Sequence, residues 1–273
     1  SDSQSKILRY GNPTGSLSKY VEGELIGNIY GYTTIGIAKT DEEMQQHLAS
    51  LPNGGQSALG SQWAAGDIMY ADLNGDGKIN NGSYTINDMG DMKKIGNSTP
   101  RFMTGINLDA AYKGWDLQMF WQGVLKRDWW PGDKNMTFWG VTDGEWWSTS
   151  FKEHLDYFRT SENPLGENLN SYYPRPIFNT KNNKSQTRYL QNAAYMRLKN
   201  IQVGYTFPKV WINKLMLQNL RIFVSGENLL TITSLSDTMD PETCGAGYQS
   251  TEQANGTVYP LAKTISFGLS VNF

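Results

Sequence analysis

The chain has 273 residues, of which 38% are hydrophobic and 12% aromatic, and its formal net charge is −2. This charge gives no basic footprint for nucleic acid, and the single cysteine, Cys244, excludes an intrachain disulfide framework and a cysteine-based zinc site. No run reaches the roughly 18 apolar residues of a membrane-spanning helix, whereas membrane-spanning β-strands leave a much weaker pattern that this composition allows. We expect Cys244 to be a free thiol in a polar loop.

The first 48 residues predict a polar start, a β-stretch and one short helix. Residues 1–6 are polar and carry no signal peptide, so we expect that further sequence precedes them in the protein. Residues 25–37 are β-branched, aromatic and dotted with glycine, which predicts a strand or a pair of strands. Thr40 is followed by three acidic residues, a capping pattern that predicts a helix to about Leu48.

The most motif-like segment lies between residues 66 and 80. Its polar side chains alternate and are followed by a glycine, as in a calcium loop of the EF-hand type. The predicted calcium ligands are Asp72, Asn74, Asp76, the backbone carbonyl of Lys78, and Asn80. Ser83 stands where a bidentate acid closes such loops, so Asp88 or Asp91 would have to complete the site. The alternative is a turn held by Asx hydrogen bonds without metal. A signalling EF-hand is disfavoured because no long amphipathic helices flank the loop.

Residues 102–122 predict the clearest hairpin. Apolar side chains alternate with small and polar ones on both arms, around a tight turn at Lys113 and Gly114. Tyr112 and Trp115 flank this turn, where the aromatic belt of a membrane protein would lie. The opposite face carries Asn107, Asp109, Asp116, Gln118 and Gln122, and is therefore expected to be wet.

Residues 125–187 contain no alternation of strand length but many aromatic side chains. Loops this long are usually functional, and clustered tryptophans can bind a protein partner or stack on sugars. The candidate contact residues for substrate or partner are Trp129, Trp130, Trp139, Trp146 and Trp147. The alternative is that these rings pack the loop onto itself.

Three further strands complete the predicted pattern. Residues 195–207 and 219–230 alternate as strands, and a helical turn is expected between them at 208–215, begun by Pro208. The last ten residues place Ile265, Phe267, Leu269, Val271 and Phe273 on one face and only small or polar residues on the other. This pattern suits a strand that faces either lipid or the core of a soluble sandwich.

Several of these pieces together resemble the C-terminal portion of the SusC/RagA family of TonB-dependent outer-membrane transporters. The pieces that carry the resemblance, in the order in which the family has them, are residues 26–37, 66–77, 95–102, 195–205, 224–229 and the terminal Phe strand. They span almost the whole chain. The departures are Ser83 at the closing position of the calcium loop and a segment at 81–94 that is longer than usual.

The resemblance implies an all-β fold made of antiparallel strands from a 22-stranded transmembrane β-barrel, with long extracellular loops and short helices. It implies that residues 1–273 are a C-terminal fragment of the barrel domain, without the plug domain and the TonB box. Within it, residues 66–100 would form the loop with the calcium motif, 125–190 the Trp-rich extracellular loop and 263–273 the terminal strand. About six strands are recognisable, too few to close such a barrel.

The resemblance also implies a function in nutrient uptake across the outer membrane of a Gram-negative bacterium, with the loops at the cell surface. The implied partners are a SusD-like surface lipoprotein, TonB acting through the missing N-terminal part, the lipid bilayer, and an oligosaccharide or peptide cargo. No nucleic acid is expected.

Two other functions compete with this interpretation. The first is a secreted or surface β-sandwich module, stabilised by calcium, that binds carbohydrate through the Trp cluster. The second is an enzyme, which the sequence disfavours because it has no nucleophile elbow, phosphate loop or zinc spacing. His47 and His154 are expected to be solvated, and nothing beyond the presence of Glu145 and Glu153 supports a glycosidase pair.

Overall fold

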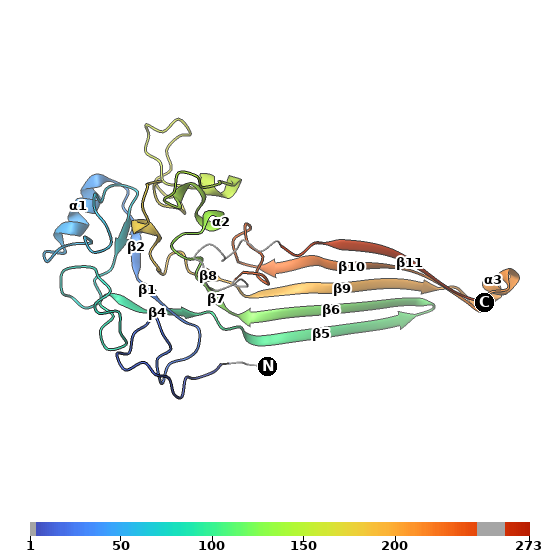
Figure 1. The fold of residues 1–273 in the computed structure, drawn as a ribbon. Helices are drawn as coiled ribbons and strands as arrows, with labels where there is room; N and C mark the ends of the chain where they lie inside the picture. The colour runs from blue at the N-terminus through green and yellow to red at the C-terminus, as the bar shows by residue number, and fades with distance from the viewer. Residues whose placement is uncertain (1–3, 245–259) are drawn as a thin grey trace.

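The computed structural model describes residues 4–244 and 260–273. It has a loop-rich part, from which a long sheet projects (Figure 1). The helices are α1 (Asp41–Ala49), α2 (Met136–Trp139) and α3 (Lys209–Ile212), with 3₁₀ turns at Gly140–Thr142, Lys152–Leu155, Lys181–Asn183 and Asn213–Leu215. The strands are β1 (Asn28–Tyr32), β2 (Thr34–Ile37), β3 (Ile68–Tyr70), β4 (Met92–Asn97), β5 (Arg101–Tyr112), β6 (Trp115–Lys126), β7 (Asp128–Trp129), β8 (Gln191–Asn192), β9 (Tyr195–Thr206), β10 (Asn219–Thr233) and β11 (Thr264–Asn272). No helix in the described residues is long and apolar enough to cross a membrane.

Five long strands form one antiparallel sheet in the order β11-β10-β9-β6-β5. The predicted hairpin is therefore confirmed as β5 and β6, and the predicted later strands as β9, β10 and β11. Among the residues that the structure describes, β5 and β11 are edge strands and the sheet does not close.

The sheet has one apolar and one polar face. One cross-strand row on the apolar face comprises Ala110, Leu117, Val203, Val224 and Phe267, whereas the adjacent row on the other face comprises Asp109, Gln118, Gln202, Ser225 and Ser266. The apolar side is not covered: the side chain of Phe267 is 81% exposed and that of Leu108 is 51% exposed. An exposed apolar surface of this extent needs an apolar partner.

A β-bulge at Lys199 adjusts this alternation. Asn200 pairs with Phe120 and Leu198 pairs with Trp121, so Lys199 is the extra residue on β9. Because a bulge shifts the alternation by one position, Arg197 lies on the polar face and Leu198 on the apolar one. The bulge thus keeps the apolar face continuous along the full strand.

The two ends of the sheet differ. At one end Lys113 and Gly114, both with positive φ (47° and 88°), form the two-residue turn between β5 and β6, and the short connection through α3 joins β9 to β10. The loop-rich part lies at the other end (Figure 1). Transmembrane β-proteins have this asymmetry, with short turns on the periplasmic side and long loops outside.

The loop-rich part has its own core of buried aromatic and aliphatic side chains, which includes Met44, Ile68, Tyr70, Trp139 and Tyr189. Helix α1 contributes Met44, and its predicted N-cap is confirmed because the Thr40 side chain accepts a hydrogen bond from the backbone N–H of Glu43 at 3.2 Å.

The strands predicted within residues 25–37 are confirmed as β1 and β2, which are short and pair with β4 and β3, because their side chains belong to the core of the loop-rich part. Three other expectations need correction, those for His154, Cys244 and His47. His154 is buried rather than solvated, and Cys244 is buried rather than lying in a polar loop, since both are covered by neighbouring segments. His47 is half-buried and its ring bonds to Gln56 at 3.1 Å.

Candidate metal site and tryptophan-rich loop

The predicted calcium segment folds into a compact acidic turn. The Asp72 carboxylate accepts hydrogen bonds from the backbone N–H groups of Gly75 and Gly77, at 2.7 and 2.9 Å. Both glycines have positive φ, which allows the chain to wrap around the carboxylate. Asn74 and Asp76 each accept from the backbone two residues further on, at 2.9 and 3.1 Å. The turn is therefore held by nested Asx hydrogen bonds.

Asp91 closes this turn from a distant position in the sequence. Its fully buried carboxylate accepts from the backbone N–H of Leu73 at 2.9 Å and of Asn80 at 2.8 Å. Burial, together with the charge of Asp72, raises the pKa of Asp91. The pKa of Asp72 is lowered, since hydrogen bonds from the backbone of Gly77 and Gly75 outweigh its desolvation. The carboxylates of Asp72 and Asp91 are thus held by the backbone of the same turn.

The remaining predicted participants divide into two groups. Ser83 does not ligate in place of an acid but donates its hydroxyl to Asp88 at 2.6 Å, so these two residues form a separate turn. The side-chain oxygen of Asn80 accepts from the backbone of Gly82 at 2.6 Å. No group of three or more acidic, histidine or cysteine side chains in the described residues has metal-binding geometry. The hard oxygen donors of Asp72, Asn74, Asp76 and Asp91 are nevertheless of the kind that suits Ca²⁺.

The structure separates the five candidate tryptophans into buried and exposed ones. Trp129 and Trp139 are buried, and their rings pack with Phe138 and Tyr189 in edge-to-face contacts. Trp130 is half-buried with its ring centroid 6.1 Å from that of Trp139. For these three residues the loop packs onto itself, so their large apolar surface stabilises the fold.

Trp146 and Trp147 lie on the outside. Their side chains are 79% and 55% exposed, and the two rings contact each other edge to face at 5.1 Å. Trp146 also borders an open cleft of about 320 Å³ whose other walls are Val141, Glu145, Ser148, Pro176, Ile177 and Phe178. Phe178 is itself 83% exposed. This cleft can take an apolar side chain or a sugar ring.

Two buried polar groups hold the backbone beneath this cleft. Asp143 accepts from the backbone of Asn135 at 2.8 Å and from the Ser148 hydroxyl at 3.2 Å, and burial raises its pKa. His154 accepts from the backbone of Phe151 through Nδ1 and donates to the carbonyl of Phe138 through Nε2. Burial lowers the pKa of His154, so the ring is neutral. Both residues have structural partners and no catalytic arrangement.

A buried ion pair ties the first hundred residues to the Trp-rich loop. The Asp67 carboxylate accepts from Arg175 at 2.7 Å, from Lys181 at 2.8 Å and from Asn182 at 2.9 Å. Although burial alone would raise the pKa of Asp67, the hydrogen bonds from these partners lower it. Sequence reasoning missed this group, because more than a hundred residues separate its members and the only local signal was a carboxylate before a short apolar run.

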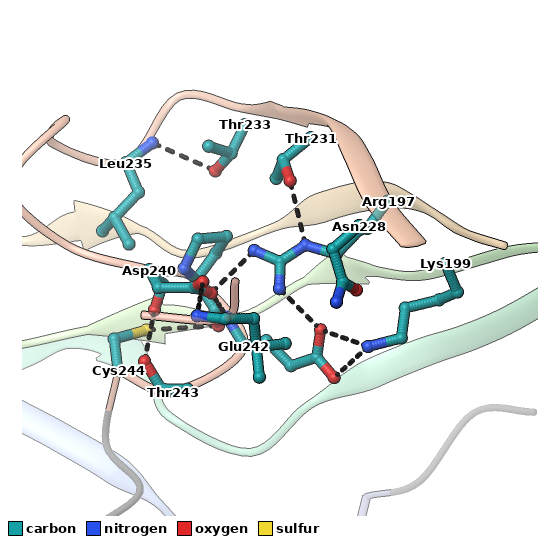
Figure 2. Close-up of polar contacts among 12 residues, drawn as sticks. Arg197, Lys199, Asn228, Thr231, Thr233, Leu235, Asp240, Glu242, Thr243 and Cys244 are labelled. Carbon is teal, nitrogen blue, oxygen red and sulfur yellow. Dashed lines mark hydrogen bonds and ion pairs between the residues drawn. The ribbon is translucent and has the colours of Figure 1, made fainter. Parts of the chain in front are cut away.

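A second ion-pair cluster, shown in Figure 2, joins the polar face of the sheet to the segment that follows β10. Arg197 on β9 binds Asp240 at 2.7 Å and Glu242 at 2.9 Å, and Lys199 binds Glu242 at 3.0 Å. Arg197 is almost completely buried. Residues 234–244 are thereby fixed across the end of the sheet.

A two-faced sheet with tight turns at one end and a structured loop region at the other has features that are typical of transmembrane β-proteins. The comparisons with known proteins agree. TonB-dependent receptor P3 of Formosa agariphila is 30% identical over 260 residues, a match that covers 92% of this chain and 22% of that protein. TonB-dependent receptor P39 of the same organism is 24% identical over 283 residues and covers 92% of this chain and 25% of its own length.

Solved structures share the fold. A structure of the RagAB peptide transporter matches 99% of this chain with a TM-score of 0.59 and 19% identity. A structure of the RagAB peptide importer in the open-open state matches 97% of this chain with a TM-score of 0.53. No family model matches the chain. The chain therefore corresponds in sequence to a part of the TonB-dependent receptors, and its fold corresponds to a part of the RagAB peptide transporter. It spans about a quarter of the length of these relatives.

Proposed function

We propose that this chain forms part of the wall and the cell-surface loops of an active importer in the outer membrane of a Gram-negative bacterium. The five long strands supply the wall, with their apolar face toward lipid and their polar face toward the lumen. The loop-rich part stands at the cell surface, and TonB supplies the energy through another part of the receptor.

The observation that carries this proposal is the uncovered apolar face of the sheet. The row of Leu108, Met119, Ile201, Gly226 and Ile265 and the row of Ala110, Leu117, Val203, Val224 and Phe267 cross all five strands without a polar side chain, and many side chains of the face are exposed. A β-sandwich would need a second sheet on that face, and within the described residues none packs there. Lipid supplies the missing apolar partner.

We propose a peptide as the cargo, captured together with a SusD-type surface lipoprotein. The likeness to the RagAB peptide transporter and the apolar cleft at Trp146 and Phe178 support this choice. An oligosaccharide is the second candidate, because the exposed ring of Trp146 could also stack on a sugar.

Fractionation and growth test this function. The native polypeptide should be found in the outer membrane as a band that migrates differently when boiled, and deletion of its gene should abolish growth on peptides as sole nitrogen source. Loss of growth on an oligosaccharide with normal growth on peptides would instead support the glycan candidate. A soluble polypeptide would refute the importer.

We also propose that the acidic turn binds Ca²⁺ through Asp72, Asn74, Asp76 and the carbonyl of Lys78, with Asp91 in place of the missing closing acid. The support is that Asp91 accepts from the backbone of Leu73 and Asn80, on either side of the turn that wraps around the Asp72 carboxylate. A divalent cation would relieve the repulsion between these two carboxylates. Calorimetric titration of the receptor with Ca²⁺ should give one binding event that Asp72→Asn removes and that Glu42→Gln, an exposed change on α1, leaves unaltered. Absence of that event in the unaltered receptor would leave the turn as an Asx structure without metal.

A further inference from the structure

The connection between β9 and β10 carries exposed apolar side chains. It comprises residues 207–218, contains α3 and lies at the turn end, away from the loop-rich part (Figure 1). Val210, Trp211 and Met216 are 78%, 61% and 89% exposed there, whereas Ile212 is buried. A short polar turn would join two strands equally well, so this exposed apolar surface needs an explanation.

Aromatic rings connect this surface to the apolar face of the sheet. Trp115 on β6 contacts Tyr205 on β9 with ring centroids 4.9 Å apart, Tyr205 contacts Phe207 at 5.1 Å, and Phe207 contacts Trp211 at 6.4 Å. Trp115 and Tyr205 form one row of the apolar face. The rings therefore extend the lipid-facing surface past the last row of the strands and onto α3.

The charge of the connection is of one sign. Residues 206–226 contain Lys209, Lys214 and Arg221 and no acidic residue. Arg221 is held by Asp116 across the sheet, whereas both lysines are exposed and have no ion-pair partner in the described part of the chain. Lys113 lies in the neighbouring β5–β6 turn, with its ammonium group 5.1 Å from the ring centroid of Tyr112.

We propose that residues 207–218 form an interfacial anchor that binds anionic phospholipid in the periplasmic leaflet. Val210 and Trp211 insert at the level of the headgroups, and Lys209 and Lys214 neutralise lipid phosphates. Exposed apolar side chains flanked by lysines are the composition of a segment that lies in a membrane interface. This inference rests on the proposed function, because it requires the apolar face to be in lipid.

A lipid titration of the full-length receptor tests the charge contacts. The receptor is purified in dodecyl maltoside, phosphatidylglycerol or phosphatidylethanolamine is added, and the unfolding temperature is followed. Phosphatidylglycerol should raise the unfolding temperature more than phosphatidylethanolamine. For each lysine removed, the attraction to an anionic lipid surface should fall about fivefold, so Lys209→Gln/Lys214→Gln should need about 25-fold more phosphatidylglycerol for the same shift.

The matched control is Lys19→Gln/Lys152→Gln, which removes the same charge from exposed positions in the loop-rich part. It should titrate like the unaltered receptor. An identical titration for the Lys209/Lys214 variant, or an equal response to both lipids, would overturn the proposal.

A depth measurement tests the insertion without any change of charge. A nitroxide label attached at Val210→Cys should collide with oxygen dissolved in the bilayer, whereas a label at Lys19→Cys should remain in water. A label at position 210 that is as accessible to water-soluble reagents as the one at position 19 would also overturn the proposal. A receptor that does not enter the outer membrane at all would refute the proposed function, whereas one that enters normally but shows neither effect refutes only the anchor.

Discussion

If the apolar face of the sheet contacts lipid, an added charge should destabilise the protein on that face and not on the polar face. Leu108 and Asn107 are neighbours in β5, both exposed, and their side chains project from opposite faces of the sheet. Leu108 pairs with Met119, between the Trp115 and Trp121 that mark a band about 20 Å long on β6. If both faces of the sheet were in water, arginine would be tolerated at both positions.

In lipid the two substitutions differ. Leu108→Arg places a cation near the middle of the apolar band, which costs about 2–4 kcal/mol at that depth and lowers the folding equilibrium constant about 30- to 900-fold. Asn107→Arg places the same side chain on the polar face, where a surface substitution changes stability by about 0.5 kcal/mol or less. The difference between the two variants therefore measures the lipid contact itself.

Folding of the full-length receptor into lipid vesicles provides the assay. The unaltered receptor and both variants are titrated with urea. At each urea concentration, the folded fraction is measured on a gel of unboiled samples, in which folded and unfolded receptor migrate as separate bands. Equal midpoints for Leu108→Arg and Asn107→Arg would refute the assignment of the apolar face to lipid. A large loss for Asn107→Arg alone would reverse the orientation of the sheet.

Three more substitutions test packing and charge. Asp67→Asn should lower the free energy of unfolding by about 3–5 kcal/mol, because it leaves Lys181 buried without its counter-ion. Since the pKa of Asp67 is lowered in the fold, the stability that its charge contributes should be lost as the pH falls from the unfolded pKa, near 4, through the folded pKa. Thermal unfolding at each pH checks both effects. His154→Gln should flatten the pH dependence of unfolding below about pH 6.5, because the unfolded state takes up a proton there that the buried, pKa-lowered ring refuses; an unchanged profile would contradict this. Gly268→Ala should cost about 1–3 kcal/mol, since its methyl group would collide with the ring of Phe223 across the strand, and Phe223→Ala should remove that penalty in a double-mutant cycle.

Period-two alternation was sufficient to predict the five long strands of the sheet. The arms of the β5–β6 hairpin and the last strand alternate over about ten residues, and the turn at Lys113 and Gly114 is short enough to fix the register from local sequence. The Lys199 bulge could not be predicted, because it depends on pairing with both β6 and β10. The strands β1 and β2 were predicted within residues 25–37, but their pairing could not be predicted, since their partners are distant segments and not each other.

The candidate sites show the same limit. The residues of the acidic turn were identified from their spacing, but Asp91 could be named only as one of two alternatives, because its approach depends on the path of the intervening loop. The five tryptophans look alike in a segment without periodicity. Whether a ring is buried like Trp139 or exposed like Trp146 is decided by contacts with Tyr189, Pro176 and Phe178, which the local sequence does not contain.

The way in which the loops are attached bears on how the exposed cleft can act. Trp146 stands on a segment whose backbone is fixed by Asp143, and Asp67 holds the same loop to the N-terminal segment through Lys181. Arg197 in turn fixes residues 234–244 to the end of the sheet. Fixed polar contacts of this kind leave few ways for the cleft to rearrange without breaking a buried ion pair. A ligand that fits the cleft would therefore meet a largely preformed surface, so substitutions of Trp146 or Phe178 should weaken capture while leaving the fold and the membrane-facing sheet intact.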